Sequence, residues 1–421
     1  MLRTRTTLST VAIAAVFVLL GAAACTDEGE ADTSTSTGSG GDPVSTGGAG
    51  AGSSDGGSGG AGGGQGGAGG EGGEGGSAPL ACLDASVTEG YFTISTDALC
   101  VVEVFTANDL ALSGYGTAPT WGRHGGPLTF TATATGVTIQ RWSESEAGVL
   151  APTDENVAVA DVPADAYWGP IAVEVDTSSE QDCPAATAVA MSWTGQDFFN
   201  EGEIVSVADA TATSVTATGV FGMAASGERL FYTGLSEAGG PTNGMLALYA
   251  ADAHSACTGG FAAGGSIDAW GLAGGPVALD ADGNLFAVLT DYTTSTQEIR
   301  AFDATEVEPG DPAVMGTEIA TMDGYGDALA AVAPTATEPG IVATQPNLGK
   351  AGTHGEIVGI EYTVDAGVFT PGATSTLLDV TDADENVVLF TDDQGRLWVG
   401  LSRDEETNPV ATFFVLARPP R

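Results

Sequence analysis

The stretch GPVALDADGNLFAVLTD, from Gly275 to Asp291, consists of two apolar runs on either side of an Asp-Gly pair. Alternating apolar residues around such a pair predict a β-hairpin with a tight turn. Similar stretches begin at three other glycines: GERLFYTGL at Gly227, GIVATQPN at Gly340 and GRLWVGLSR at Gly395. Together with Gly283, these glycines are 56, 57 and 55 residues apart. The chain therefore repeats one hairpin at a nearly constant interval.

Each hairpin belongs to a larger unit. An apolar run precedes it and another follows it after a polar loop, while STLLDVTD, which begins at Ser375, is a candidate fourth strand. A period of about 50 residues with four short strands per unit is typical of a β-propeller, whose blades stack around an axis. One blade alone is too small to bury both of its faces, which explains the repetition. We therefore predict an all-β fold, a β-propeller.

A second marker extends the repeat toward the N-terminus. An aromatic residue followed by glycine stands before the first strand of each unit: Trp121-Gly122, Trp168-Gly169, Phe221-Gly222, Trp270-Gly271 and Tyr325-Gly326. WGRHGGPLTF, from Trp121, and WGLAGGPVAL, from Trp270, agree closely, which we interpret as internal similarity. A ring at this point is expected to wedge neighbouring blades while glycine lets the chain turn into the channel. The alternative is that the rings form a stacking platform for a ligand.

The blade number is seven or six. Five doublets mark five blades, and another blade begins near Glu385. The segment from Tyr91 to Gly116 is either a short seventh blade or the closing strands of the sixth. A tally of about 26 strands lies between the roughly 24 of six blades and the roughly 28 of seven, and we favour seven. In either case the ring is expected to close by placing N-terminal strands beside the C-terminal strand TFFVLA.

The N-terminus has the pattern of a secretory signal. Arg3 and Arg5 precede an apolar run that ends at Cys25 and is shorter than the roughly 20 residues of a membrane-spanning helix. Its last residues, Ala-Ala-Ala-Cys, resemble a bacterial lipobox, in which the cysteine becomes the lipidated first residue; ordinary signal-peptidase cleavage fits the same bond. We predict a signal peptide over residues 1–24 and lipidation of Cys25. The protein is then exported and held at a cell membrane or outer membrane surface by lipid alone.

A glycine-rich segment follows the signal. More than half of the residues from Gly38 to Gly76 are glycine, and the rest are mostly Ser, Ala, Thr and acids. Such a composition cannot bury enough apolar surface to fold, and its typical span as a flexible coil is roughly 35 Å. We predict a disordered linker over residues 25–78 and a propeller domain over residues 79–421.

The cysteine count is odd, which is unusual for an exported chain. Assigning Cys25 to lipid leaves four that can form disulfides in an oxidising compartment: Cys82, Cys100, Cys183 and Cys257. Four cysteines allow three connectivities, of which Cys82 with Cys100 and Cys183 with Cys257 keeps partners close along the chain. The alternative is four buried thiols.

The chain is strongly acidic. It has 11 Lys and Arg against 55 Asp and Glu, a formal net charge of −44. Such a surface repels phosphate backbones and anionic head groups, so nucleic acid is excluded as a partner and the membrane is contacted through the lipid anchor only. Metal cations and basic proteins remain as partners.

Two stretches, DADGNLFAVLTD and DDQGRLWVGLSR, resemble blades of the NHL, SMP-30 and two-component-regulator propeller families, in which an Asp-x-x-Gly turn precedes an apolar strand. The resemblance covers about Gly219 to Ser402 and implies a propeller fold. In SMP-30-like lactonases the site is a metal held by acidic and amide residues at the channel mouth. No such set is matched here residue by residue, so that activity is not carried over.

Few residues have the spacing of a catalytic or metal site. The histidines, His124, His254 and His354, do not cluster as zinc ligands do. Calcium is the remaining cofactor candidate, because one group of side chains copies the oxygen spacing of a calcium loop: Asp382, Asp384, Asn386 and Asp393. A second group is Asp280, Asp282 and Asn284. The alternative is that these Asp and Asn residues form tight turns.

We predict a cell-surface, lipid-anchored propeller that binds or scaffolds an extracellular protein, peptide or glycan without catalysis. The expected ligand contacts lie at the aromatic doublets and the basic pair beside the first of them: Trp121, Arg123, His124, Trp168, Trp270 and Tyr325. The alternative function is a propeller hydrolase or lactonase with a divalent cation at the channel mouth. A fold of this kind hosts both functions.

Overall fold

The structure is a computed structural model. The residues it describes are 81–112, 119–122, 125–133, 136–160, 168–176, 187–194, 202–208, 211–216, 220–235, 246–252, 266–268, 272–291, 296–307, 316–323, 328–345, 355–381, 386–403 and 409–420. The predicted signal peptide, Cys25 and the linker lie outside these residues. Among the residues described, no helix is both long enough and apolar enough to cross a membrane.

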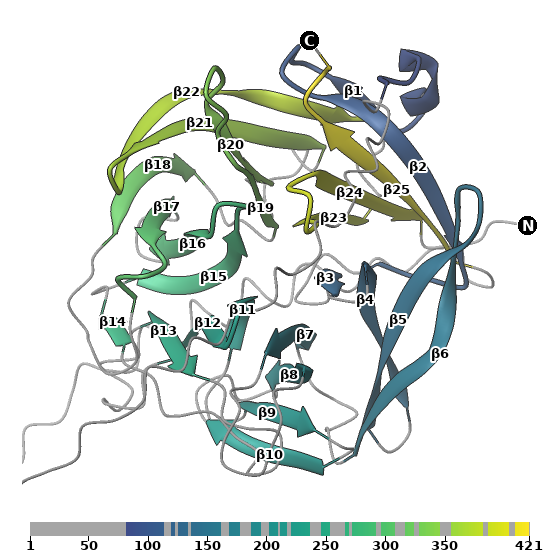
Figure 1. The fold of residues 1–421 in the computed structure, drawn as a ribbon, viewed down its shortest axis with the longest axis vertical. Helices are drawn as coiled ribbons and strands as arrows, with labels where there is room; N and C mark the ends of the chain where they lie inside the picture. The colour runs from purple at the N-terminus through teal and green to yellow at the C-terminus, as the bar shows by residue number, and fades with distance from the viewer. Residues whose placement is uncertain are drawn as a thin grey trace, which may run out of the picture. The chain divides into compact units, whose positions relative to one another are not determined.

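The described strands form five hydrogen-bonded sheets (Figure 1). The largest has eight strands and contains two blades joined by a short parallel pairing, Thr106↔Val149 and Ala107↔Leu150, so the ring has six antiparallel blades. Blade 1 contains β3 (Thr120–Gly122), β4 (Gly126–Thr133), β5 (Gly136–Glu146) and β6 (Val149–Ala160); blade 2 contains β7 (Trp168–Asp176), β8 (Thr187–Thr194), β9 (Gly202–Ala208) and β10 (Thr211–Thr216); blade 3 contains β11 (Val220–Ser226), β12 (Arg229–Leu235), β13 (Leu246–Asp252) and β14 (Ser266–Asp268). Blade 4 contains β15 (Leu272–Leu279), β16 (Asn284–Asp291), β17 (Thr296–Asp303) and β18 (Thr317–Asp323); blade 5 contains β19 (Leu329–Val332), β20 (Gly340–Thr344), β21 (Glu356–Asp365) and β22 (Val368–Val380); blade 6 contains β23 (Asn386–Thr391), β24 (Leu397–Arg403), β25 (Val410–Ala417) and β2 (Cys100–Asn108).

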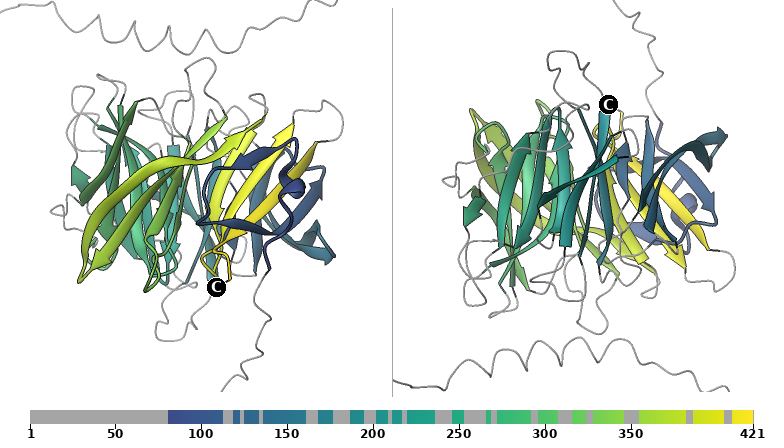
Figure 2. Two further views of the ribbon diagram at one scale, coloured as in Figure 1. Left: turned by 90° about the horizontal axis from the view of Figure 1, so that it is seen from above. Right: turned by 90° about the horizontal axis from the view of Figure 1, so that it is seen from below.

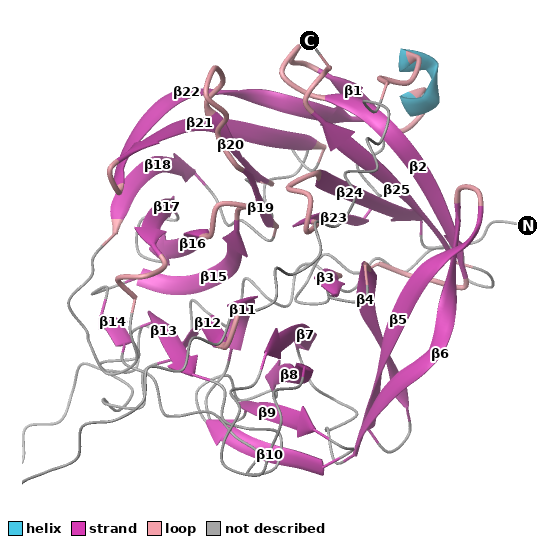
Figure 3. Ribbon diagram, in the orientation of Figure 1, coloured by secondary structure: helices cyan, strands magenta, loops and turns pink. Residues whose placement is uncertain are grey.

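The blades are arranged in a ring. The first strand of each blade contacts the first strand of the next, in the order β3, β7, β11, β15, β19 and β23, and β23 contacts β3 again. Figure 2 shows the sheets side by side around this ring. Figure 3 shows that the described residues are strands and turns apart from one short 3₁₀ helix, Ala85–Thr88. The predicted all-β propeller is confirmed.

The ring closes through a strand from the other end of the chain. β2 pairs antiparallel with β25 from Cys100↔Ala417 to Asn108↔Val410, so it is the fourth strand of blade 6. β1 (Phe92–Ile94) adds to the outer edge of blade 5 by pairing with β22. The expected closure beside TFFVLA is confirmed. The preference for seven blades is wrong, because the N-terminal strands complete blades 6 and 5 and build no blade of their own.

The repeated hairpins are the first two strands of blades 3 to 6. Gly227, Gly283 and Gly395 lie in the turns between those strands with φ of 57°, 82° and 73°, a backbone conformation that glycine adopts without strain. Gly340 opens β20 instead, and a Cβ there would lie 2.3 Å from Cζ of Tyr362. The repeat read from the sequence is thus structural.

The similarity between WGRHGGPLTF and WGLAGGPVAL is not a structural equivalence. Leu272–Leu279 is one continuous strand, β15, whereas the corresponding residues after Trp121 turn between β3 and β4, where the N–H of Gly125 bonds to the carbonyl of Gly122. Trp121 is the middle residue of β3, and Gly122 ends that strand, while Trp168 begins β7. The expectation that each doublet stands before the first strand of its unit is therefore wrong for Trp121-Gly122, whereas Trp168-Gly169 and Phe221-Gly222 lie at the start of β7 and β11; the other two doublets lie outside the described residues.

An aromatic cluster joins blade 6 to blade 1. The ring of Trp398 stacks on Phe105 of β2 and on Phe390 of β23, with centroids 5.2 and 5.5 Å away, and contacts Trp121 of β3 at 5.0 Å. Trp398 is 2% exposed and is among the largest fully buried side chains. The closing strand is therefore held by apolar burial as well as by its hydrogen bonds.

A disulfide holds the closing strand at its first residue. Cys82 is bonded to Cys100, and the N–H of Leu83 bonds to the carbonyl of Val101 beside it. Of the connectivities that the sequence leaves open, the structure shows the one that pairs Cys82 with Cys100. Cys183 and Cys257 lie outside the described residues.

We expect replacement of Cys82 and Cys100 by serine to lower the free energy of unfolding by about 3 kcal/mol, because the bond closes a loop whose ends are 18 residues apart. Urea unfolding of the oxidised protein and the double variant measures this difference. Equal unfolding midpoints would show that the bond does not hold β2 in the ring.

Candidate binding site on the turn face

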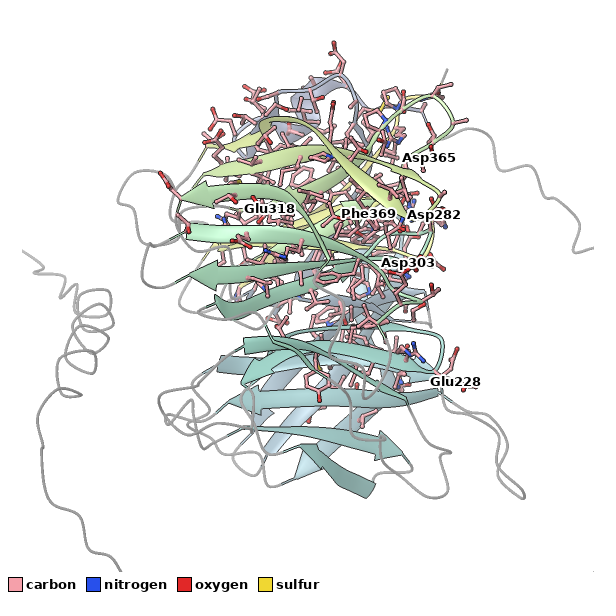
Figure 4. The ribbon with its side chains drawn as sticks, turned by 90° about the vertical axis from the view of Figure 1, so that its left-hand side faces the viewer. Glu228, Asp282, Asp303, Glu318, Asp365 and Phe369 are labelled. Atoms are coloured by element: carbon pink, nitrogen blue, oxygen red, sulfur yellow. A yellow bond between two sulfur atoms is a disulfide. The ribbon has the colours of Figure 1, made fainter. Side chains whose placement is uncertain are left out.

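One side of the ring is formed by turns that carry carboxylates. We name it the turn face and define it by the turns β11–β12, β15–β16, β21–β22 and β23–β24. Figure 4 shows Glu228, Asp282, Asp303 and Asp365 along this edge of the sheets. Glu228, Asp282 and Asp365 are exposed. The two turns of blades 4 and 6 meet there, because a Cβ on Gly395 would lie 3.0 Å from Cβ of Ala281.

Two buried aspartates build these two turns in the same way. Asp280, 6% exposed, accepts the backbone N–H groups of Asp282 and Asn284 on Oδ1 at 3.0 and 2.8 Å. Asp392, 5% exposed, accepts those of Gln394 and Arg396 on Oδ1 at 3.0 and 2.8 Å. A carboxylate that satisfies two backbone donors fixes the turn that follows it.

The second oxygen of each aspartate bonds to an aromatic side chain. Oδ2 of Asp392 accepts Trp398 Nε1–H at 2.9 Å and Arg396 Nε–H at 2.6 Å, and Arg396 also pairs with Glu103 of β2 at 2.9 Å. Asp392 therefore joins the turn to the aromatic cluster and, through Arg396, to the closing strand.

Oδ2 of Asp280 accepts the hydroxyl of Tyr362 at 2.5 Å and Asn284 Nδ2–H at 2.8 Å. Tyr362 is fully buried on β21 of blade 5, so this bond links blades 4 and 5. Burial raises the pKa of the Tyr362 phenol well above its usual range, and the nearby Asp280 carboxylate raises it further. Tyr362 is therefore held in its neutral, hydrogen-donating form.

Trp121 lies beside these turns on β3. Its ring is half-buried against Trp398, whose N–H bonds to Asp392, so Trp121 is at the turn face of blade 6. The indole N–H of Trp121 is inside the protein surface and has no hydrogen-bond acceptor among the residues that the structure describes. An unpaired buried donor is costly and is rare in native proteins.

The structure describes only part of the predicted contact set. Trp121 is described in full. Trp168 begins β7, and Thr120 bonds to the carbonyl of Ala172, so Trp121 is level with the middle of β7 and away from Trp168 at its start. The other members, Arg123, His124, Trp270 and Tyr325, lie outside the described residues.

The two described residues of the first predicted calcium group lie far apart. Asn386 begins β23 and Asp393 follows its end, so the two are separated by about 20 Å of extended strand, while Asp382 and Asp384 lie outside the described residues. Among the described residues, no group of three or more His, Cys, Asp or Glu could hold a metal ion.

In the second predicted calcium group, Asp280 is occupied by hydrogen bonds of its own turn and of Tyr362. These bonds agree with the alternative interpretation from the sequence, in which the Asp and Asn residues form a tight turn.

Sequence reasoning missed Trp398, Asp392 and Tyr362. A signal for the first two exists, since Asp-x-x-Gly is followed by an aromatic residue both in Asp392–Trp398 and in Asp280–Phe286. The Tyr362 contact joins residues 82 positions apart and has no local signal.

The chemistry open to this site is binding by charge and by an aromatic face. The buried Asp280 and Asp392 stabilise turns, and the buried Glu174 pairs with Arg141 of the neighbouring blade at 2.7 Å. Asp282 and Asp393 are exposed on the two turns that meet, next to the aromatic cluster that includes Trp121.

No family model matches the sequence, and no curated protein matches it. Solved structures that resemble the fold include AofleA from Arthrobotrys oligospora, with 13% identity over 77% of this chain and 86% of that one and a TM-score of 0.37. A subtype N10 neuraminidase-like protein associated with the little yellow-shouldered bat has 9% identity over 72% and 95%, with a TM-score of 0.40. Drosophila Semaphorin 1a, extracellular domains 1–2, has 10% identity over 76% and 87%, with a TM-score of 0.36. Likenesses at this level carry nothing about function.

We expect Asp392→Asn to lower the free energy of unfolding by about 2 to 4 kcal/mol, because an amide nitrogen would face the Arg396 and Trp398 donors. Asp393→Asn removes the same charge from the exposed neighbour and should change it by less than about 0.5 kcal/mol. Denaturant unfolding of both variants tests the difference, and equal effects would refute the role given to Asp392.

The raised pKa of Tyr362 predicts a loss of stability at alkaline pH. Because the neutral phenol is favoured in the folded state, its contribution is complete below the unfolded pKa of about 10 and is lost as the pH rises above it. Tyr362→Phe should be less stable at pH 7 but should lose less stability between pH 9 and 11. Urea unfolding across this range, with Tyr91→Phe as the comparison, measures both effects. A steeper alkaline loss in Tyr362→Phe would contradict the assignment.

Proposed function

We propose that the protein is an exported, lipid-anchored propeller that binds a partner protein without catalysis. We further propose that the turn face binds a segment of that partner rich in lysine and arginine. The observation that carries the proposal is Trp121, an aromatic ring half-buried against Trp398 beside two turns that carry exposed carboxylates.

The site is already rigid before a ligand binds. Trp121 packs on Trp398, which is held between Phe105 and Phe390 and bonded to Asp392. A supported aromatic side chain with little freedom to lose is the usual anchor of a protein interface.

The charges around Trp121 favour a cationic partner. Asp282 and Asp393 are exposed on turns that meet at this face, and the whole chain has a net charge of −44. A lysine or arginine placed on the Trp121 ring would gain a cation–π contact next to carboxylates. The field of the whole protein would also speed its approach.

The sequence supports display at a surface. The signal over residues 1–24, a lipid on Cys25 and a linker with a span of roughly 35 Å would hold the propeller away from the membrane. A domain placed in this way can meet proteins outside the cell.

The test uses the chain without its signal peptide and with Cys25→Ser. Calorimetric titration compares an Arg- and Lys-rich peptide with an Asp- and Glu-rich peptide of equal length and with neutral oligosaccharides. We expect the basic peptide alone to bind, with an affinity that falls as salt rises.

Two variants of the site and one control variant test whether the peptide binds at the turn face. Trp121→Leu keeps an apolar side chain but removes the aromatic face and should weaken binding about tenfold. Asp282→Asn with Asp393→Asn should weaken binding and reduce its dependence on salt. Glu318→Gln, a charge change on the outer strand β18, is the matched control and should leave the affinity unchanged. Binding of the acidic peptide, or equal effects of all variants, would refute the proposal; binding of an oligosaccharide alone would assign a glycan ligand instead.

A further inference from the structure

Gln297 is a buried polar side chain that the fold does not satisfy. It lies on β17 of blade 4, between Thr290 of β16 and Met322 of β18 in the sheet register. Its exposure is 0%, and neither its Nε2 nor its Oε1 has a hydrogen-bond partner within the described part of the chain. An amide has two donor hydrogens and a carbonyl acceptor, and leaving all of them unpaired in a protein interior is strongly unfavourable.

The side chain is directed at the next blade. Residues two apart on a strand share one face, so Gln297 shares a face with Ile299 and Ala301. Those two residues pack in one cluster with Val342, Val358 and Ile360 of blade 5, among others. Gln297 is thus at the edge of the apolar layer between blades 4 and 5.

A second buried polar group lies at the same level in blade 5. The rings of Phe286 and Tyr362 are in contact at 4.9 Å, and Phe286 pairs with Ala301 across the sheet. Gln297 precedes Ala301 by four residues on β17. Four residues back along β21 from Tyr362 is Val358, whose cross-strand partner is Thr344.

Thr344 can act as an acceptor toward this space. It is 0% exposed, and its hydroxyl donates to the carbonyl of Ala328 at 3.0 Å. A hydroxyl that donates one bond retains lone pairs that accept others. Two blades therefore bring a donor-rich amide and an acceptor to the same level of their interface.

We propose that Gln297 and Thr344 form a buried site that binds one ordered water molecule between blades 4 and 5. The water accepts a hydrogen bond from Gln297 Nε2 and donates one to Thr344 Oγ1. Internal waters of this kind typically make about three hydrogen bonds to buried polar groups and are costly to remove. The site would fasten the two blades beyond their apolar contact, independently of any ligand on the turn face.

The first experiment counts long-lived internal waters in the full chain by magnetic relaxation dispersion of water nuclei. Gln297→Met, which keeps the length of the side chain without its polar atoms, should lose one such water. Thr344→Val should lose the same water, whereas Thr344→Ser, which keeps the hydroxyl, should retain it. An unchanged count in Gln297→Met overturns the proposal.

Thermal unfolding gives an independent result. If the water is bound, Gln297→Met lowers the unfolding midpoint by about 1 to 3 °C, and the double variant with Thr344→Val loses less than the sum of the single variants. If the amide is unsatisfied, Gln297→Met raises the midpoint, and the proposal fails. Should Gln297→Met not fold, a nuclear Overhauser contact between the Gln297 amide protons and water in the unaltered protein decides the question, and its absence overturns the proposal.

Discussion

The pairing of β2 with β25 is the contact on which the ring depends. Each blade needs two neighbours to bury its faces, so a ring with one open junction would leave two blades half covered. The closing strand comes from the N-terminal end of the domain and joins the C-terminal strand along nine residues, Cys100–Asn108. Phe105 of this strand stacks on Trp398, and Trp398 contacts Trp121 of blade 1. The hydrogen bonds and the apolar contacts that close the ring are thus both made by β2. The disulfide at Cys100 holds the first residue of this strand.

The groups that hold blades together also shape the turn face. Asp392 fixes its own turn and bonds to Trp398, and Asp280 fixes a second turn and bonds to Tyr362 of the next blade. Thr391 likewise exchanges hydrogen bonds with the backbone of Ala331 between blades 6 and 5. Because these buried groups keep the turns in place, the exposed carboxylates beside them and the ring of Trp121 are held at fixed positions without a ligand. Stability and the proposed binding role therefore rest on the same residues.

The hairpins and the closure of the ring beside the C-terminal strand could be predicted, whereas the blade number and the side-chain contacts between blades could not. Alternating apolar residues around Gly283 and Gly395 predicted the first two strands of a blade, because such a pattern is determined by the nearest residues. The blade number was predicted wrongly: pairing beside the C-terminal strand was expected, but nothing in the sequence near β2 indicates that this strand completes blade 6 and builds no blade of its own. Trp121 was selected as a contact residue from its neighbours, but its support by Trp398 and the link of Tyr362 to Asp280 join distant parts of the chain.

Hydrogen exchange of the backbone amides, measured at the level of single strands, tests the closure most directly. If β2 is an integral strand of blade 6, its amides and those of β25 should exchange only through global unfolding, with the same free energy as the amides of β24. Exchange of β2 and β25 at a much lower free energy than β24 would show that the ring remains folded without its closing strand, and this would contradict the central role given to that pairing.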